Sequence, residues 1–285
     1  MKLFLIRHAE SVDNVAQLYA GLRDSLLTNH GVLQAECLGQ HLAARGLRFT
    51  DIFASDLKRA FKTADAIRLA QPMNDQRGLS YTLQILSTPL LREQDFGALE
   101  GVSYVASRQV PADVKVDLET KDRMVVRAEQ FLDDYLIPVL AIEDVSQDPV
   151  VAVVSHGIFL NVLWRQLLRR FTPSSITAPP DILPADRRTS VEYLAWGNTA
   201  FLELDLGRAL PHAGRQPGIP DNNIAPGTLP SPPVPLLSQW RLTLVAINAR
   251  DHLTAIAKRT GGGIGSSRYD EGQKKIDNYF IRKVP

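Results

Sequence analysis

Two short apolar segments, far apart in the chain, each lead to a histidine, and this pair constrains the fold most. Residues 2–6 precede Arg7 and His8, and residues 149–154 end one residue before Ser155 and two before His156. Neither run has helical periodicity, and both have the length of a strand buried on both faces of a parallel sheet. Ligand sites of open α/β sheets lie beyond the carboxyl ends of strands. We therefore expect His8 and His156 to meet in one cleft.

Strand-like and helix-like segments alternate along most of the chain. Helices are expected where apolar residues recur at helical spacing, and strands where short apolar runs lack it. The expected helices cover residues 28–45, 56–69, 123–142 and 157–170, and further expected strands cover 51–54, 81–91 and 240–247. This alternation predicts an α/β fold with three layers, α/β/α, around a mostly parallel central sheet.

Proline is concentrated in two stretches that interrupt the alternation. Residues 172–190 contain four prolines and residues 207–235 contain eight. Proline lacks a backbone N–H, so it neither continues a helix nor donates to a sheet. We expect the first stretch to be largely loop and the second to be a long extended excursion. The predicted organisation is an α/β domain over 1–206, the Pro-rich excursion over 207–235, and a returning strand with a polar C-terminal tail over 236–285.

Composition excludes several classes of protein. Lys and Arg total 32 against 31 Asp and Glu, a net charge of +1, which argues against a nucleic-acid binder. Cys37 is the single cysteine, so an internal disulfide and a zinc site of several thiolates are excluded. One cysteine suits a reducing compartment, the cytoplasm or the nucleus. Neither a signal-peptide pattern nor an apolar run of membrane-spanning length is present, so we expect a soluble chain that does not bind membranes.

Five sequence blocks together resemble one known family. They are Arg7-His8-Ala9-Glu10-Ser11 with Asn14, residues 20–28, residues 54–64 with Arg59, residues 91–101 with Glu93, and residues 153–157 with His156. In this order they resemble the histidine phosphatase superfamily, specifically its phosphoglycerate-mutase-like branch, over about residues 1–206. Ala9 stands where the family usually has glycine. This departure requires only that the backbone at Ala9 has no positive φ.

The resemblance implies a site for phosphoryl transfer. His8 would be the nucleophile and form a phosphohistidine, with a backbone carbonyl holding its other ring nitrogen. Glu93 would donate and then accept the proton, and His156 would stabilise the transition state. The implied phosphate-binding residues are Arg7, Asn14, Arg59, His156 and Gly157. No metal and no other cofactor is implied, because the arginines and histidines supply the positive charge.

The resemblance leaves alternatives open. The family contains hydrolases and mutases, and a small helical cap insertion is expected at about residues 97–148. This segment is short and at best weakly basic, which favours a phosphatase acting on a small phosphate ester over a phosphoglycerate-mutase-type phosphotransferase. A non-catalytic interaction module is the third alternative, and the Pro-rich segment 207–235 could bind a protein partner. Residues 261–267 are glycine-rich but lack the Gly-Lys-Ser/Thr ending of a nucleotide-binding loop. The oligomeric state is open.

Overall fold

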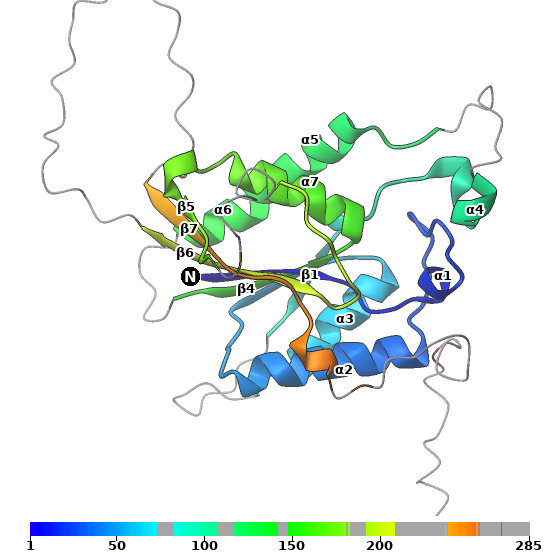
Figure 1. Ribbon diagram of the computed structural model, residues 1–285, viewed down its shortest axis with the longest axis horizontal. Helices are drawn as coiled ribbons and strands as arrows, with labels where there is room; N and C mark the ends of the chain where they lie inside the picture. The colour runs from blue at the N-terminus through cyan, green and yellow to red at the C-terminus, as the bar shows by residue number, and fades with distance from the viewer. Residues whose placement is uncertain are drawn as a thin grey trace, which may run out of the picture.

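A central sheet with helices on both faces organises the part of the chain that the structure describes (Figure 1). The computed structural model describes residues 1–72, 83–107, 117–141, 148–180, 182, 192–208, 237, 239–254, 256 and 269. The strands are β1 (Lys2–Arg7), β2 (Asp51–Ser55), β3 (Ile85–Thr88), β4 (Val150–Ser155), β5 (Ile176–Thr177), β6 (Phe201–Arg208) and β7 (Trp240–Ala249). The α-helices are α1 (Val12–Val15), α2 (Asn29–Ala44), α3 (Lys58–Leu69), α4 (Tyr104–Ser107), α5 (Lys121–Phe131), α6 (Ile137–Ala141) and α7 (Gly157–Leu168).

The strand order is β3-β2-β4-β1-β6-β7-β5. The four strands β3, β2, β4 and β1 are parallel to one another, and β5 is parallel to β7. β6 is antiparallel to both β1 and β7. The predicted α/β fold with a mostly parallel sheet is therefore confirmed. In the register of the two central strands, Arg7 pairs with Ser155, so the residues that follow both strands emerge at the same edge.

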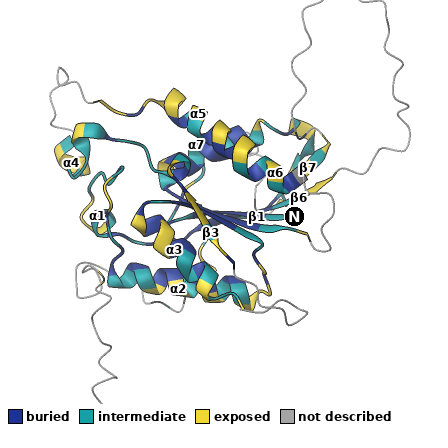
Figure 2. Cartoon of the chain, turned by 180° about the vertical axis from the view of Figure 1, so that it is seen from behind, coloured by how far each residue is buried: buried dark blue, intermediate teal, exposed yellow. Residues whose placement is uncertain are grey.

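Two apolar cores lie on opposite faces of the sheet. Leu3 and Leu5 pack in one core with residues of α5 and α7, whereas Phe4 and Ile6 pack in the other with residues of α2 and α3. Successive side chains of a strand point to opposite faces, so an unbroken apolar run supplies both cores. Figure 2 shows the result, with buried strands between helices whose outer faces are exposed.

Several helix and strand boundaries agree with the sequence, and others differ for local reasons. Thr28 caps α2 as expected, because its Oγ1 accepts the N–H of Gly31 at 2.9 Å. α3 begins two residues later than expected, because the carboxylate of Asp56 binds Arg92 and Leu57 is extended. The expected strand over 81–91 is shorter: β3 ends at Thr88 and a 3₁₀ turn, Pro89–Leu91, follows. Residues 81 and 82 lie outside the described part.

The long helix expected over 123–142 is three consecutive pieces. α5 begins at Lys121, because Thr120 Oγ1 accepts the N–H of Arg123 at 3.3 Å. A π turn, Leu132–Leu136, separates α5 from α6. The buried residues of α5 are Met124, Ala128 and Phe131, which pack in the core with α7. The segment expected as a cap, 97–148, therefore includes α5 and α6, which lie in the helical layer over the sheet. The same segment also contains α4 and a 3₁₀ turn, Gly97–Leu99.

Both Pro-rich stretches lie partly or wholly outside the described residues. In the first, a 3₁₀ turn, Pro173–Ser175, leads into the short strand β5, which the sequence did not predict within this mainly loop segment. β5 exists because Ile176 and Thr177 pair with β7. The second stretch lies outside the described part from residue 209 to 235, as does the glycine-rich segment 261–267. β7 covers the expected returning strand and is followed by a 3₁₀ turn, Asp251–Leu253. Among the described helices, none has the length and apolar character to cross a membrane.

Candidate active site

The two histidines meet at the carboxyl edge of the central strands. The ring centroids of His8 and His156 are 5.0 Å apart, and the ring planes are inclined at 57°. The side chains are nearly or fully buried, with relative exposures of 3% and 0%. The parallel register of β1 and β4 produces this neighbourhood, because each histidine follows the last residue of its strand.

The contacts of His8 define which ring nitrogen is free. His8 Nδ1 lies 2.7 Å from the carbonyl oxygen of Ala9. A carbonyl only accepts, so Nδ1 carries the proton and the lone pair of Nε2 is free, as expected. Burial lowers the pKa of His8 well below 6.5, and the positive charges of Arg59 and Arg7 lower it further. The imidazole is therefore neutral at neutral pH, the form that can act as a nucleophile.

Ala9 fits the glycine position of the motif without strain. Its φ is not among the positive values found in the described residues. The side chain of Ala9 is fully buried, and the backbone N–H of Ala9 donates to Thr63 Oγ1 at 3.0 Å. Thr63 belongs to α3, so this bond joins the loop after β1 to the helix that carries Arg59.

His156 is fully buried, and neither of its ring nitrogens has a hydrogen-bond partner among the described residues. Burial lowers its pKa well below 6.5, and the charges of Arg59, His8, Arg7 and Arg127 add to this effect. A neutral imidazole keeps one N–H to donate. An unpaired buried donor is costly unless a ligand satisfies it. His156 is therefore positioned to bind an acceptor oxygen beside His8.

Arg7 and Arg59 bring two guanidinium groups to the histidines. Arg59 is 1% exposed, and its two terminal nitrogens donate to the carbonyls of Arg23 and Gly21, both at 2.7 Å. Arg7 Nη1 donates to the carbonyl of Trp196 at 2.6 Å. In both arginines Nε is buried, and no described residue accepts a hydrogen bond from it. Burial lowers the pKa of both groups, and the carboxylate of Glu93 offsets this, so the pair remains charged and able to bind an anion.

The loop that holds Arg59 depends on Gly21. This residue has a φ of +53°, in the left-handed region, and a Cβ there would lie 2.0 Å from the carboxylate of Glu100. The same Glu100 oxygen accepts the N–H of Leu22 at 2.7 Å. Only glycine fits both the conformation and the close approach.

Asn14 is oriented by a residue that the sequence did not reveal. Asn14 Oδ1 accepts from Asn198 Nδ2 at 3.0 Å and from the N–H of Ser11 at 3.2 Å. Asn198 Nδ2 also donates to the carbonyl of His8 at 3.1 Å. Because both bonds use the oxygen of Asn14, its amide NH₂ is left to donate to a ligand.

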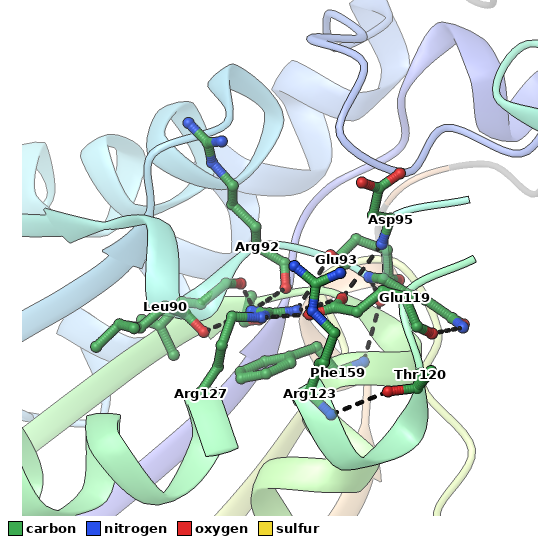
Figure 3. Close-up of polar contacts among 12 residues, drawn as sticks. Leu90, Arg92, Glu93, Asp95, Glu119, Thr120, Arg123, Arg127 and Phe159 are labelled. Carbon is green, nitrogen blue, oxygen red and sulfur yellow. Dashed lines mark hydrogen bonds and ion pairs between the residues drawn. The ribbon is translucent and has the colours of Figure 1, made fainter. Parts of the chain in front are cut away.

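Glu93 lies at the N-terminus of α7. Its carboxylate accepts the N–H of Phe159 at 3.0 Å, the N–H of Ile158 at 3.3 Å and the N–H of Gln94 at 3.0 Å (Figure 3). A helix N-terminus favours a carboxylate through its free N–H groups and its dipole. Ser155 Oγ donates to the carbonyl of Leu91 at 2.7 Å and so joins β4 to the segment that leads to Glu93.

A cavity of about 440 Å³ connects these groups. Of the seven residues expected in the site, six line it: Arg7, His8, Asn14, Arg59, Glu93 and Gly157. The seventh, His156, contacts His8 within the protein. A larger cavity of about 1000 Å³ lies between α2 and α3, and none of the seven residues lines it. The smaller cavity is thus the candidate active site.

Some functional contacts could not be found from sequence motifs. Asn198, the carbonyl of Trp196 and the ion pair of Arg127 with Glu119 all come from outside the five blocks. No periodicity or spacing marks them, because their partners are distant in the chain. Within the described residues, no group of three or more His, Cys, Asp and Glu side chains could hold a metal ion.

The chain is similar to known proteins of one superfamily. The model of the histidine phosphatase superfamily (branch 1) matches residues 3–180. A probable phosphatase of Schizosaccharomyces pombe is 32% identical over 96% of this chain and 78% of its own length. A probable fructose-2,6-bisphosphatase TIGAR A of Danio rerio is 29% identical over 57% of this chain and 74% of its own length. A 2,3-bisphosphoglycerate-dependent phosphoglycerate mutase of Mesorhizobium japonicum is 39% identical over 38% of this chain and 48% of its own length.

Solved structures show the same fold. A mycobacterial glucosyl-3-phosphoglycerate phosphatase in complex with VO3 has a TM-score of 0.57 at 18% identity. That match covers 87% of this chain and 99% of the other. A structure described as mycobacterial hydrolase 1 has a TM-score of 0.59 at 19% identity, with the same coverage.

Proposed function

The chain belongs to branch 1 of the histidine phosphatase superfamily and is a phosphatase, and from this premise we propose that it hydrolyses a small phosphate monoester in the cavity beside His8. The observation that carries the proposal is the free Nε2 of His8, a neutral buried nucleophile facing two arginines. The family implies the two-step reaction, and the contacts in the cavity support the task that we propose for each residue.

In the first step, Nε2 of His8 forms a bond to phosphorus while the bond from phosphorus to the ester oxygen breaks. Arg7 and Arg59 hold the phosphate oxygens, and the N–H of His156 and the amide of Asn14 donate to the same group. Glu93 gives its proton to the leaving oxygen, so the alcohol departs neutral. Gly157, the first residue of α7, lines the cavity where the phosphate sits.

In the second step, water replaces the alcohol. Glu93, now a carboxylate, takes a proton from water, and the resulting hydroxide attacks phosphorus as the bond to Nε2 breaks. Inorganic phosphate leaves and Glu93 is protonated again. We propose that the two arginines supply the positive charge and His156 supplies a neutral hydrogen-bond donor, so that no metal ion is needed. Steady-state rates in excess EDTA should then equal those without EDTA.

A mutase is the second candidate, because the mutase of M. japonicum is similar over part of the chain. A mutase must keep water from the phosphohistidine, whereas a phosphatase must admit it. Incubation with a phosphoglycerate separates the two. We expect inorganic phosphate and glycerate, and formation of the phosphoglycerate isomer at a higher rate would show a mutase instead.

The direct test of the function compares wild type with His8→Ala on 4-nitrophenyl phosphate. We expect release of phosphate by wild type and a loss of about 10⁴-fold or more in the variant. Thermal melting checks that the variant is folded. Equal background rates in both proteins would leave a non-catalytic interaction module as the explanation.

We propose that the chain acts in the cytoplasm or the nucleus. We also propose that the Pro-rich segment 207–235 binds a protein partner. The single cysteine and the prolines support these two assignments. Imaging of a tagged chain tests the first. Comparison of proteins captured by the chain with and without residues 209–235 tests the second.

A further inference from the structure

The cavity has two chemically different parts. The charged residues among those described in its lining are Arg7, Arg59 and Glu93, all assigned to the phosphate or the proton. Apart from the residues assigned to the phosphate or the proton, the lining is neutral and mainly apolar. It consists of Tyr19, Ala20, Gly21, Phe96, Tyr104, Ile158, Asn161, Leu194 and Trp196.

Three of these residues form one aromatic cluster. The ring centroid of Tyr19 is 4.7 Å from that of Phe96 and 4.7 Å from that of Tyr104. Tyr104 is 42% exposed, so part of its ring is free to contact a ligand. Tyr104 lines the same cavity as Arg7, His8 and Glu93, which places it near the reacting groups. Rings prefer to stack on other rings in offset or edge-to-face arrangements.

We propose that this phosphatase prefers monophosphate esters whose leaving group carries a flat aromatic ring near the ester oxygen. The ring would pack on Tyr19, Phe96 and Tyr104 while the phosphate lies on Arg7 and Arg59. A second anionic group on the substrate has no cationic partner among the described lining residues beyond these two arginines. This inference rests on the proposed function, since it concerns the substrate of that same site.

The test uses esters that differ in shape but have similar leaving-group basicity. Benzyl, cyclohexylmethyl and n-butyl phosphates are all alkyl esters of primary alcohols. We expect kcat/KM for benzyl phosphate to exceed that for the other two by about five-fold, the size of one aromatic contact. Tyr104→Leu should remove most of this preference. Val105→Ala is the matched control, because Val105 is the next residue, is 63% exposed and does not line the cavity.

Equal kcat/KM for the three esters would overturn the aromatic preference while leaving the phosphatase function intact. Retention of the full benzyl preference in Tyr104→Leu would overturn the assigned contact. If the wild type hydrolysed none of the three esters and no 4-nitrophenyl phosphate, the proposed function itself would be wrong. The three failures are therefore distinguishable.

A second, independent observation concerns how Glu93 is held. Arg127 of α5 forms a two-point ion pair with Glu119, with both N···O distances at 2.8 Å. The same guanidinium donates to the carbonyls of Leu90 at 2.7 Å, Arg92 at 3.2 Å and Glu93 at 3.4 Å (Figure 3). One side chain thus binds three carbonyls of the segment that ends at Glu93.

Arg127 also contacts the helix that receives the carboxylate of Glu93. The guanidinium carbon lies 4.4 Å from the ring centroid of Phe159, a cation–π contact. The N–H of Phe159 is a donor to Glu93. Arg127 therefore touches both the backbone that carries Glu93 and the first turn of α7.

Glu119 completes this arrangement. It is 8% exposed, its carboxylate accepts the N–H of Asp95 at 3.3 Å, and its own N–H donates to the carbonyl of Asp95 at 2.8 Å. Gln94 Nε2 donates to the carbonyl of Glu119 at 2.9 Å. Residues on both sides of Glu93 are thus held by Arg127 and Glu119, a partly buried ion pair. We infer that Arg127, with Glu119, is a positioning residue that holds Glu93 over the ester oxygen.

The test exploits the dependence of an acid catalyst on the leaving group. 4-Nitrophenolate departs without a proton, whereas an alkoxide needs one. In Arg127→Met, we expect the rapid first turnover with 4-nitrophenyl phosphate to be within about three-fold of wild type. The turnover of n-butyl phosphate should fall about ten-fold or more, in the direction of Glu93→Gln, for which a loss of about 10²-fold is expected. Lysine cannot form the two-point pair, so Arg127→Lys should not restore the rate.

Two controls separate positioning from general damage to the fold. Arg123→Met changes an exposed arginine one turn earlier in α5 and should leave both rates unchanged. In the double variant with Glu93→Gln, loss of Arg127 should add little, because its effect acts through Glu93. Fully multiplicative losses, or equal losses with both esters, would overturn the positioning role.

Discussion

The phosphate-binding side of the site and the proton-transfer side are positioned in different ways. His8 and His156 follow adjacent parallel strands, so the register of β1 and β4 places them. Glu93 follows a 3₁₀ turn and is held by α7 and by Arg127 of α5, across separations of 66 and 34 positions in the chain. The histidines of the first side stand at strand ends, whereas Glu93 of the second side depends on side chains of a separate helix. Changes in α5 should therefore damage proton transfer while leaving phosphate binding intact.

Arg59→Met should have the largest effect of the variants that sharpen this comparison. It removes a fully enclosed charge from the phosphate-binding side, and we expect kcat/KM to fall about 10²- to 10³-fold. The loss should be the same for aryl and alkyl esters, because phosphate binding does not depend on the leaving group. Steady-state kinetics with 4-nitrophenyl and n-butyl phosphate provides the measurement.

Lys58→Met is the matched control for Arg59. Lys58 precedes Arg59 in α3, pairs with Asp24 at 2.8 Å and is 61% exposed at its side chain. An exposed ion pair contributes little, so kcat/KM should change less than about two-fold. A loss in Arg59→Met that is larger for one class of ester would break the division between the two sides.

Asn198→Ala should have an intermediate effect. The variant loses the amide that donates to both the carbonyl of His8 and Oδ1 of Asn14. We expect kcat to fall about ten-fold, because the amide of Asn14 can then rotate and no longer always presents its NH₂ to the phosphate. Asn14→Ala and the double variant complete the cycle, and independent losses from the two asparagines would contradict this link.

The positions of the two histidines follow from the sequence more directly than the position of Glu93. Arg7, His8 and His156 stand next to unbroken apolar strands, which is a local signal that sheet geometry converts into a place in space. Glu93 was expected from the family motif, yet its contact with the N-terminus of α7 needs the packing of α5 and α7. Arg127 and Asn198 carry no local pattern at all. Their partners lie on other elements, so only the three-dimensional structure identifies them.

The same distinction explains the fold. Continuous apolar runs predicted β1 and β4, and helical spacing predicted α2 and α3. β5 was missed because its two residues form a strand only through pairing with β7. The interruption of the helix after Phe131 was missed because no residue spacing announces a π turn.

A further prediction concerns the protonation state of His8 rather than a rate. Its pKa is lowered well below 6.5, so the imidazole should stay neutral as the pH falls from about 7.5 to 6.5. NMR of the ring nitrogens should show no titration of His8 in that interval. A midpoint near 6.5 would contradict the burial and the charges of Arg7 and Arg59 as the controlling factors.

His252 should have the smallest effect, and on stability alone. Its Nε2 lies 2.9 Å from Thr199 Oγ1, and burial lowers its pKa to about 4, with a contribution from His41. In the unfolded chain His252 binds a proton below about pH 6.5, whereas in the folded chain it does so only near pH 4. The folded state therefore loses stability as the pH falls from about 6.5 to about 4. His252→Gln should reduce the fall in melting temperature between about pH 7 and 5 by about 2 °C. An identical fall in the variant would exclude His252.

The central claim is that Nε2 of His8 receives the phosphoryl group. Rapid quenching of the enzyme during hydrolysis of 4-nitrophenyl phosphate, followed by peptide mass spectrometry and ³¹P NMR, tests it directly. We expect an acid-labile, base-stable phosphate on His8 in wild type, more of it in Glu93→Gln because water attacks more slowly, and none in His8→Ala. Phosphate on another residue, or turnover without any phosphoenzyme in Glu93→Gln, would contradict the claim.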